Sequence, residues 1–401
     1  MITDSVLQYI GIAEAERVLD PEQLEALLER PASLERLRVK PGRSLLASWS
    51  SDVPETSGRG DLARHGWVAL LTDPDKAAGV LRRAARGGAT VTVHRRDRLL
   101  SGGIETDPKL ARPLAHARKL LDDSTRVDVV RYNPARRLIL RIRGPRVPDG
   151  DSLLRISPKG LGPLLRAEEA WSRSGAPVPR HRWWGLRTTA AVVPFWGHGD
   201  LSDIRDIAAA RACGRAIATV HGSDPHMFSD EASNGISAVP TAPATPPEGP
   251  ITALLPRLTS RIRLVNDRLR LATRNLPATA VPIHGDLTPD QVLTDGAEIR
   301  IVDLDRARIG SAAQDLGTWG AACLLLETPE LNRAFLDGYR ELLPVPDLAP
   351  WICGSLLASA LEPFRNWCPD WALRIERRVD LAAHVIGLDD GGPRPVEGSL
   401  R

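Results

Sequence analysis

The chain has 401 residues, enough for two or three domains that each bury an apolar core. Its 53 Lys and Arg residues nearly balance 50 Asp and Glu residues, and the net charge of +3 gives no sign of a nucleic-acid-binding protein. Four cysteines lie far apart without the paired spacing of a metal site, which indicates reduced, mostly buried thiols in a cytoplasmic protein: Cys213, Cys323, Cys353 and Cys368. Residues 1–18 contain neither a basic region nor a long apolar run, so we expect no signal peptide and no membrane span.

The N-terminal part predicts helices followed by β-structure. Residues 1–30 carry apolar side chains at helical spacing, and Asp20-Pro21 marks the start of a second helix. The next elements are two β-like runs within 37–50 joined by a Pro-Gly turn, a third run at 67–71, a basic helix at 76–86 and a hairpin at 91–93 and 99–100.

This β-rich pattern recurs further along the chain. Residues 130–142 align with residues 37–49 at an offset of 93, with four identical pairs: Arg38 and Arg131, Pro41 and Pro134, Arg43 and Arg136, and Leu45 and Leu138. Residues 153–156 then take the place of 67–71, and each copy continues into a helix. We therefore predict two tandem hairpin–strand–helix units, an internal duplication, with chance similarity as the alternative.

The rest of the chain is predicted to be mainly helical. After a helix at 162–174, an apolar run at 189–195 leads into a helix at 204–221. His221, at the end of that helix, is interpreted as a hydrogen-bonding structural histidine. The Pro-rich residues 239–250 predict an exposed linker. The later predicted helices are 251–274, 318–326, 331–342, 350–361 and 370–386, and the Gly/Pro-rich end of the chain is predicted to be disordered.

Residues 283–317 carry the chemistry. Asp286 follows a short apolar strand, Gln291 comes five residues later, and Asp303 lies near the end of a second strand predicted at 299–304. In phosphoryl transfer one carboxylate accepts the proton of the acceptor hydroxyl, while an amide oxygen and a second carboxylate hold magnesium on the phosphates. The alternative is an Asp-Gly hairpin with solvated acids.

This stretch resembles the aminoglycoside phosphotransferase family and, within that superfamily, the maltokinase-like small-molecule kinases. The matching positions are His284, Gly285, Asp286, Gln291, Asp303, Asp315 and Leu316. Most relatives have Asn where this chain has Gln291, and the maltokinase-like members also have Gln. The resemblance implies an α+β, protein-kinase-like fold of two lobes. Its predicted parts are an N-terminal cap that duplicates the N-lobe hairpin unit (1–110), a β-rich N-lobe with the hinge (111–200), a helical C-lobe with the catalytic loop (201–390) and a disordered tail (391–401).

The resemblance also implies roles for individual residues. Asp286 is the expected general base, Gln291 and Asp303 are the expected magnesium ligands, and Asp305 is a weaker candidate for a second metal. Backbone groups near Val193 and Phe195 are expected to hold the adenine.

The phosphate-binding side departs from the family pattern. Arg155 stands where these enzymes have a strand Lys, and the two side chains are not equivalent at a tight phosphate site. Glu168 or Glu169 is expected to orient Arg155, and Lys159 is the alternative cation. Arg136 or Arg137 is a further candidate for contact with the phosphates.

Three functions remain open at this point. The first is a kinase that uses ATP (or GTP) with magnesium to phosphorylate a hydroxyl of a small molecule, such as a sugar or an aminosugar-containing natural product. The second is a pseudokinase-like nucleotide- or ligand-binding protein, and the third is a scaffold that binds partners through the duplicated unit. The set of Asp286, Gln291 and Asp303 favours the first, because a scaffold has no need of converging base and metal ligands. The expected partners are the nucleotide and the small molecule, with no nucleic acid and no membrane.

Overall fold

The computed structural model describes residues 3–52, 60–86, 90–94, 98–228, 243, 248–274, 276 and 280–388. The predicted tail at 391–401 and most of the predicted linker at 239–250 lie outside these residues. No helix in the described ranges is both long and apolar enough to cross a membrane. All four cysteines are free thiols, and three of them are buried.

The N-terminal cap is a five-stranded antiparallel sheet with the strand order β1-β2-β3-β5-β4. Its strands are β1 (Ser33–Lys40), β2 (Ser44–Ser50), β3 (His65–Leu71), β4 (Thr92–Val93) and β5 (Leu99–Gly103). Its helices are α1 (Asp4–Ile10), α2 (Glu16–Leu19), α3 (Pro21–Leu28) and α4 (Pro74–Arg86), with a 3-10 turn η1 (Gly60–Arg64). As the sequence predicted, α3 begins with Pro21, and the Asp20 side chain accepts from Gln23 N at 3.0 Å.

A second five-stranded antiparallel sheet has the same connectivity, in the order β6-β7-β8-β10-β9. Its strands are β6 (Arg126–Asn133), β7 (Arg137–Arg143), β8 (Asp151–Ile156), β9 (Arg182–Trp183) and β10 (Ala190–Pro194). Its helices are α5 (Ala111–Arg118) before the sheet and α6 (Gly162–Arg173) after β8, with 3-10 turns η3 (Ile104–Thr106) and η4 (Pro148–Gly150).

The first hairpin of each sheet confirms the predicted duplication. Strands β1 and β6, and likewise β2 and β7, have bounds that differ by the predicted offset of 93. Gly42 and Ala135, at equivalent places in the two turns, both have positive φ, 66° and 58°. Positive φ is unfavourable for alanine, and the Asp107 carboxylate holds the turn by accepting from Ala135 N at 2.8 Å. The repeated sequence therefore encodes a repeated backbone.

The C-lobe is mainly helical and carries two small antiparallel sheets, β11-β13-β14 and β12-β15. The strands are β11 (Gly199–Asp200), β12 (Val281–Ile283), β13 (Val292–Thr294), β14 (Ile299–Ile301) and β15 (Arg308–Gly310). The helices are α7 (Leu201–Ile204), α8 (Ile207–His221), α9 (Glu248–Leu254), α10 (Thr259–Ala272), α11 (Ala312–Leu326), α12 (Pro329–Arg340), α13 (Ala349–Ala358), α14 (Glu362–Arg365) and α15 (Trp371–Val385). Short 3-10 turns are η5 (Pro225–Phe228), η6 (Pro256–Leu258), η7 (Pro289–Gln291) and η8 (Leu304–Arg306).

Two predicted elements of this lobe end earlier than expected. The single helix predicted at 251–274 is divided into α9 and α10 by η6, because Pro256 has no N–H to continue the helical ladder. The strand predicted at 299–304 ends at Ile301, and Asp303 adopts a left-handed conformation with φ 63° and ψ 47°. Asp303 therefore begins a 3-10 turn instead of ending a strand.

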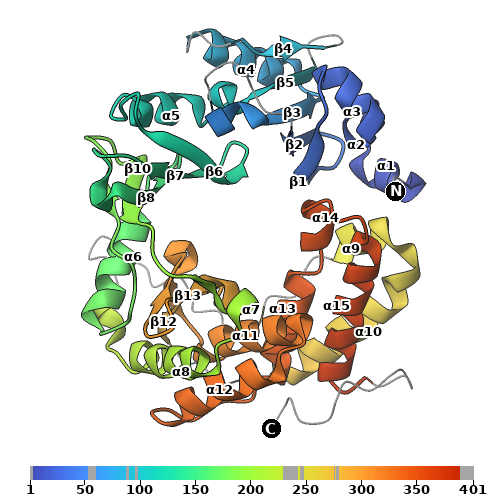
Figure 1. The fold of residues 1–401 in the computed structure, drawn as a ribbon. Helices are drawn as coiled ribbons and strands as arrows, with labels where there is room; N and C mark the ends of the chain where they lie inside the picture. Colours follow the sequence, from blue (N-terminus) through green and yellow to red (C-terminus); the bar gives the residue numbers. More distant parts are fainter. Residues whose placement is uncertain are drawn as a thin grey trace.

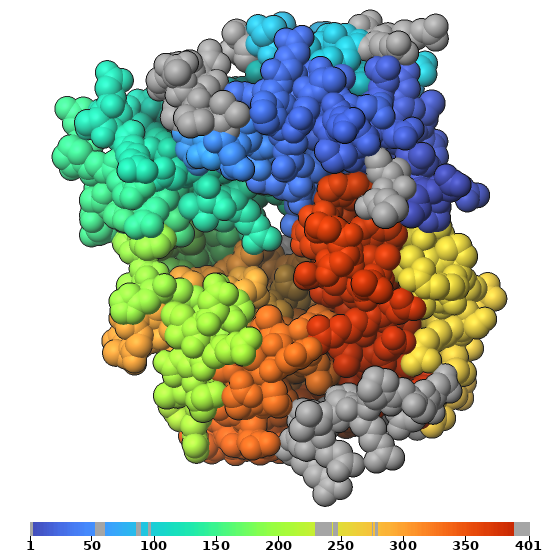
Figure 2. Space-filling model, turned by 45° about the vertical axis from the view of Figure 1, so that its right-hand side comes forward, coloured from blue at the N-terminus to red at the C-terminus, as the bar shows by residue number. Residues whose placement is uncertain are grey.

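The cap packs on both lobes. One face of its sheet, which includes Trp67, shares a core with the second sheet. The opposite face, which includes Trp49, shares a core with helices α9, α10, α13 and α15. The cap therefore covers the second sheet, as predicted, and also contacts the C-terminal helices, which was not predicted (Figure 1). Figure 2 shows the cap lying directly against the C-terminal helices on the outer surface.

The Trp-rich segment near the C-terminus contributes to this cap contact. The ring centroid of Phe364 lies 5.9 Å from that of Tyr9 in α1. It lies 5.3 Å from the ring centroid of Trp371 and 6.0 Å from that of Trp367. Edge-on aromatic contacts of this kind stabilise packing beyond the apolar area that they bury. These rings therefore form aromatic packing between the cap and the C-terminal helices. The predicted fold class is confirmed: an α+β protein with a β-rich N-lobe, a duplicated N-terminal β-rich cap and a mainly helical C-lobe.

Candidate active site between the lobes

The predicted catalytic loop follows β12. Gly285 has φ 81°, and a Cβ at this position would lie 2.5 Å from the Arg306 carbonyl oxygen. Only glycine fits a left-handed position with the backbone so near. The turn at Gly285 brings the loop round so that the next residue, Asp286, has a half-exposed side chain.

Asp315 fixes this loop from beneath. Its side chain is fully buried and accepts hydrogen bonds from His284 N at 2.7 Å and Gly285 N at 2.8 Å. His221 Nε2 lies 3.3 Å from the same carboxylate, and His221 Nδ1 lies 3.0 Å from the Tyr339 hydroxyl. Burial by itself raises the pKa of Asp315, but the hydrogen bonds and charges of His221 and His284 outweigh it and lower that pKa. His221 is thus a structural residue, as interpreted from the sequence, and Asp315 holds the loop as an ionised acceptor.

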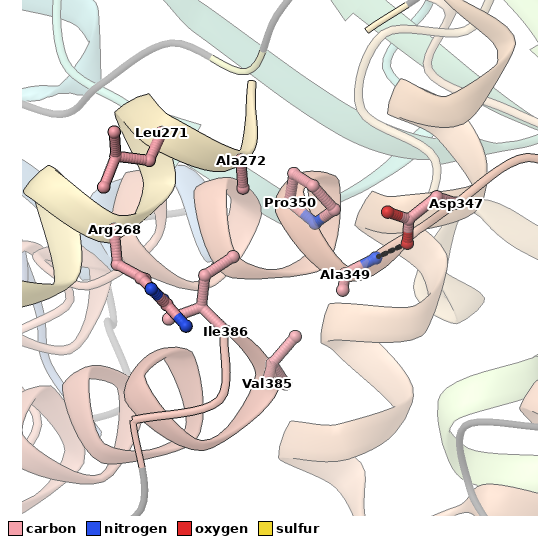
Figure 3. Close-up of a pocket in the computed structure, with 8 residues that line it drawn as sticks. All are labelled: Arg268, Leu271, Ala272, Asp347, Ala349, Pro350, Val385 and Ile386. Atoms are coloured by element: carbon pink, nitrogen blue, oxygen red, sulfur yellow. Dashed lines mark hydrogen bonds between the residues drawn. The ribbon is translucent and has the colours of Figure 1, made fainter. Parts of the chain in front are cut away.

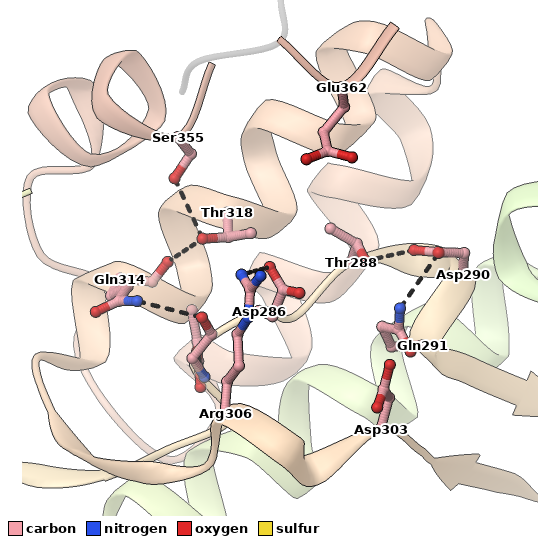
Figure 4. Close-up of polar contacts among 12 residues, drawn as sticks. Asp286, Thr288, Asp290, Gln291, Asp303, Arg306, Gln314, Thr318, Ser355 and Glu362 are labelled. Carbon is pink, nitrogen blue, oxygen red and sulfur yellow. Dashed lines mark hydrogen bonds and ion pairs between the residues drawn. The ribbon is translucent and has the colours of Figure 1, made fainter. Parts of the chain in front are cut away.

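Asp286 has the environment of a base. Burial is the main influence and raises the pKa of this carboxyl, and the Arg306 charge partly offsets it. Arg306 Nη1 donates to Asp286 Oδ1 at 3.0 Å. The remaining carboxylate oxygen is not involved in that contact and can accept a proton (Figure 4).

The predicted metal ligands lie on the opposite side of the loop. In Figure 4 Gln291 lies between Asp290 and Asp303. Gln291 Nε2 donates to Asp290 Oδ2 at 3.3 Å, and in the described part of the chain its amide oxygen accepts no hydrogen bond.

Asp303 and Asp305 are held by two arginines of the second sheet. Arg137 Nη1 lies 2.9 and 3.1 Å from the two oxygens of Asp303 and 3.3 Å from Asp305. Arg155 donates to Asp303 at 3.3 Å and also to Asp305. Burial opposes ionisation of Asp303, but the charges of Arg137 and Arg155 outweigh it and lower the pKa to about 2. These four side chains join the N-lobe to the C-lobe across the site.

The donor set fits magnesium in its chemistry. Asp303 is ionised, Gln291 offers a free amide oxygen, and magnesium prefers such oxygen ligands. No group of three His, Cys, Asp or Glu side chains within the described ranges has the arrangement of a metal site. A magnesium ion on Asp303 would have to replace at least one of its contacts with the two guanidinium groups.

The prediction that Glu168 or Glu169 orients Arg155 is wrong. Glu168 is buried and receives hydrogen bonds from His181 N at 3.0 Å and His181 Nδ1 at 2.6 Å, and Glu169 is exposed. Because His181 satisfies Glu168, Arg155 pairs with the aspartates instead. The Arg155 side chain is only 7% exposed, and its Nε is buried without a partner in the described residues.

The other predicted nucleotide-binding residues are placed as follows. Lys159 is exposed in the turn after β8. Val193 is buried in β10, opposite Leu153. Phe195 N donates to Asp151 O at 3.0 Å, and the Phe195 ring lies under the Arg141 guanidinium at 3.6 Å. Because Pro194 has no N–H, neither residue 194 nor residue 195 has a free backbone donor for an adenine in this conformation.

Two residues near the site were not anticipated from the sequence. Arg306 follows Asp305 in the same motif and could have been noticed as the cation nearest Asp286. Glu362 comes from α14, and its carboxylate is directed toward the Asp286 and Thr288 side of the site (Figure 4). No local pattern links Glu362 to the catalytic loop.

A cavity of about 410 Å³ lies away from this site (Figure 3). It is lined by residues of α10, α13, α15 and their flanking segments, including Arg268, Asp347 and Ile386. None of the predicted catalytic, metal or nucleotide residues lines it.

Comparison with known proteins identifies the class. Residues 124–350, more than half of the chain, match the model of the phosphotransferase enzyme family. The chain therefore belongs to this family. This agrees with the resemblance of its catalytic motif to the aminoglycoside phosphotransferase superfamily. The protein-kinase-like fold predicted from that motif is thereby confirmed.

Several solved structures are similar to the chain at low identity. The macrolide 2'-phosphotransferase of Brachybacterium faecium has 17% identity and a TM-score of 0.43, over 70% of this chain and 99% of that one. A choline/ethanolamine kinase family protein of Mesorhizobium loti has 15% identity and a TM-score of 0.47, over 69% and 94%. The Plasmodium vivax ethanolamine kinase has 11% identity and a TM-score of 0.45, over 66% and 84%. No curated protein sequence matches the chain.

Proposed function

We propose that this chain is an ATP-dependent phosphotransferase that phosphorylates a hydroxyl group of a small molecule such as a sugar or an aminosugar-containing natural product. The observation that carries the proposal is that two carboxylates of the predicted catalytic segment, Asp286 and Asp303, have pKa values shifted in opposite directions. The pKa of Asp286 is raised and that of Asp303 is lowered. Pairs of acids whose environments separate their pKa values are typical of sites with one base and one permanently charged group.

In the proposed reaction Asp286 accepts the proton of the acceptor hydroxyl. The acceptor oxygen forms a bond to the γ-phosphorus of ATP, and the bond from that phosphorus to the bridging oxygen breaks to release ADP. Arg306 orients the Asp286 carboxylate, and the Asp315 anchor keeps the loop in place. Such positioning of a base contributes roughly 10²–10⁴-fold to the rate.

The nucleotide side of the proposal rests on Asp303, Gln291 and Arg155. Asp303 and Gln291 would hold magnesium, which neutralises developing charge on the phosphates when bound. The Arg155 guanidinium lies 3.3 Å from Asp303, and guanidinium groups bind phosphate well, so Arg155 is the proposed replacement for the family's strand Lys. Lys159, Asp305 and the backbone near Val193 and Phe195 remain proposed contacts. We also propose that the domain boundaries lie near residues 110, 200 and 390. The proposed location is the cytoplasm, where ATP is available.

One observation favours a second candidate function. The guanidinium groups of Arg137 and Arg155 already neutralise Asp303 and Asp305. A pseudokinase-like protein would keep these ion pairs and bind nucleotide without magnesium, or not at all.

A thermal-shift titration tests which of these holds. The full chain is titrated with ATP in the presence and absence of MgCl2, and phosphate transfer to a panel of glycosides is then measured. The phosphotransferase predicts stabilisation that grows with magnesium and transfer to at least one glycoside. Stabilisation that magnesium does not change, with no transfer, would favour the binding protein.

A further inference from the structure

A strip of arginines lies where the cap meets the second sheet. On β1, Leu37 and Val39 face the core shared with the C-terminal helices. Because side chains alternate along a strand, Arg36 and Arg38 face the opposite way, toward the second sheet. Arg131 and Arg136 of the β6–β7 hairpin belong to the same strip.

This strip contains more positive than negative charge. Arg36 donates hydrogen bonds to Glu362 at 3.4 Å and to Asn366 at 3.2 Å. Glu362 also accepts a hydrogen bond from Arg365 at 2.7 Å. Among the described residues Arg38, Arg131 and Arg136 have no carboxylate within ion-pair distance.

Asp107, whose charge partly offsets the lowering of the pKa of Arg38, already accepts several hydrogen bonds. It accepts from Tyr132 Oη at 2.7 Å, Ala135 N at 2.8 Å and Leu110 N at 2.8 Å. Of the four arginines in the strip, Arg36 is therefore the one with a carboxylate partner among the described residues, and it shares that partner, Glu362, with Arg365.

The arginines affect one another. Burial is the main cause that lowers the pKa of Arg36, and the neighbouring charges of Arg131, Arg136 and Arg137 lower it further. The pKa of Arg38 is lowered in the same way by burial and by Arg136. Arg36 and Arg38 are partly buried, and like charges repel more strongly beside partly buried groups than in water, so an anion bound here would offset that repulsion.

A groove of about 200 Å³ runs along this strip. It lies between β1, β6 and the segment after α14, and its charged and polar lining residues are Arg36, Arg131, His65, Asn366 and one acid, Glu35. The Nδ1 atom of His65 is buried and has no hydrogen-bond partner in the described residues. The groove thus combines room for a small anionic group with two guanidinium groups, and one of them, that of Arg131, has no ion-pair partner among the described residues.

Arg36 relates the groove to two side chains near the active site, Arg137 and Glu362. The Arg36 charge is close enough to influence Arg137, whose guanidinium lies 2.9 Å from Asp303. Glu362, the partner of Arg36, is directed toward Asp286 and Thr288 in Figure 4. Arg155 and Arg137 already lie on the Asp303 side of the site, where the nucleotide phosphates are proposed to bind, so the groove lies on the side left for the acceptor.

We propose that this groove, through Arg36 and Arg131, binds a phosphate or carboxylate group carried by the acceptor molecule. The inference rests on the proposed phosphotransferase function and narrows its substrate to an anionic hydroxyl compound. It also gives the cap a role in substrate recognition, since Arg36 belongs to strand β1 of the cap.

Binding of inorganic phosphate to the full chain tests the groove independently of catalysis. Arg36→Ala and Arg131→Ala are compared with wild type by calorimetry, and Arg43→Ala is the matched control. Arg43→Ala removes the same charge from the β1–β2 hairpin of the cap. Arg43 is exposed and has no ion pair in the described part of the chain. Arg131 is also exposed and unpaired, so its removal does not threaten folding. We expect both groove variants to bind phosphate about tenfold or more weakly and Arg43→Ala to bind as wild type, because a hydrogen bond to a charged group is lost. Equal affinity in all four proteins overturns the proposal.

Two further measurements identify the source of the anion. Transfer from ATP is measured with a neutral hexose, the corresponding uronate and the hexose monophosphate, and binding is measured with AMP-PNP. We expect one of the two anionic acceptors to have the highest kcat/KM, an advantage that Arg36→Ala and Arg131→Ala lose while AMP-PNP affinity is unchanged. A parallel loss of AMP-PNP affinity would show that the groove serves the nucleotide, and preference for the neutral hexose would also contradict the proposal. If phosphate binds through these arginines but no acceptor is phosphorylated, the groove stands and the proposed reaction fails.

Discussion

Asp315→Asn should destabilise the protein strongly while hardly changing its volume. The carboxylate accepts from two backbone N–H groups, at 2.7 and 2.8 Å, and lies 3.3 Å from His221 Nε2. An amide has one oxygen, so its NH2 group would face a donor that is buried and cannot reach water. Each hydrogen bond to a charged group contributes about 1.5–3 kcal/mol, and breaking a buried charged network costs about 3–5 kcal/mol. Since Asn keeps one acceptor, we expect a loss of roughly 3–5 kcal/mol, not the full sum of three bonds.

Urea unfolding at pH 7 measures this loss. Asp337→Asn is the control, because Asp337 is a half-exposed acid whose single ion pair, to Arg340 at 3.3 Å, is worth about 0.5 kcal/mol or less. The pKa of Asp315 is lowered in the folded protein, so its contribution is present above the unfolded value of about 4 and is lost as pH falls through the folded value. The difference between wild type and Asp315→Asn should therefore shrink in acid. A loss below about 1 kcal/mol at pH 7 would show that the catalytic loop does not depend on this anchor.

Three other substitutions test the active site. Asp286→Asn should lower turnover roughly 100-fold or more without loss of stability in urea, because burial raises the pKa of Asp286 and its ionised form is unfavourable in the fold; near-normal turnover would sink the base assignment. For the same reason wild-type turnover should fall in acid with a midpoint above the ordinary carboxyl value of about 4. Asp303→Ala should abolish magnesium-dependent ATP binding in calorimetry, and binding that stays unchanged and magnesium-sensitive would show the ligand assignment to be wrong. Arg155→Ala should weaken ATP binding while Arg155→Lys retains transfer; unchanged ATP affinity in Arg155→Ala would shift attention to Lys159.

The repeated topology could be predicted because turn chemistry and strand alternation are local. The Pro-x-Arg turns and the apolar positions on either side recur at a fixed offset, and each hairpin is determined by residues within about twenty positions. The catalytic loop was predictable for the same reason, since Gly285 and the following acids are close in sequence.

The ion pairs of Arg155 could not be predicted in this way. Its partners Asp303 and Asp305 lie about 150 residues further along the chain, and the nearer candidate, Glu168, is taken by His181. Which carboxylate a buried arginine meets depends on how the lobes pack, and helix and strand patterns do not contain that information.

The contact between the cap and the C-terminal helices could not be predicted for a related reason. Buried residues on both faces of β2 and β3 indicate that the cap sheet is covered on two sides. The pattern does not say which helices provide the cover, and here they come from the opposite end of the chain.

Transfer of labelled phosphate tests the central claim most directly. The wild-type chain and Asp286→Asn are incubated with γ-labelled ATP, magnesium and a mixture of neutral and anionic hydroxyl compounds, and labelled organic phosphoesters are then separated. The proposed function predicts a labelled phosphoester with the wild type and roughly 100-fold less with Asp286→Asn. If the wild type binds magnesium and ATP but forms no phosphoester, or if Asp286→Asn forms it at the same rate, the assignment of this site to phosphoryl transfer is contradicted.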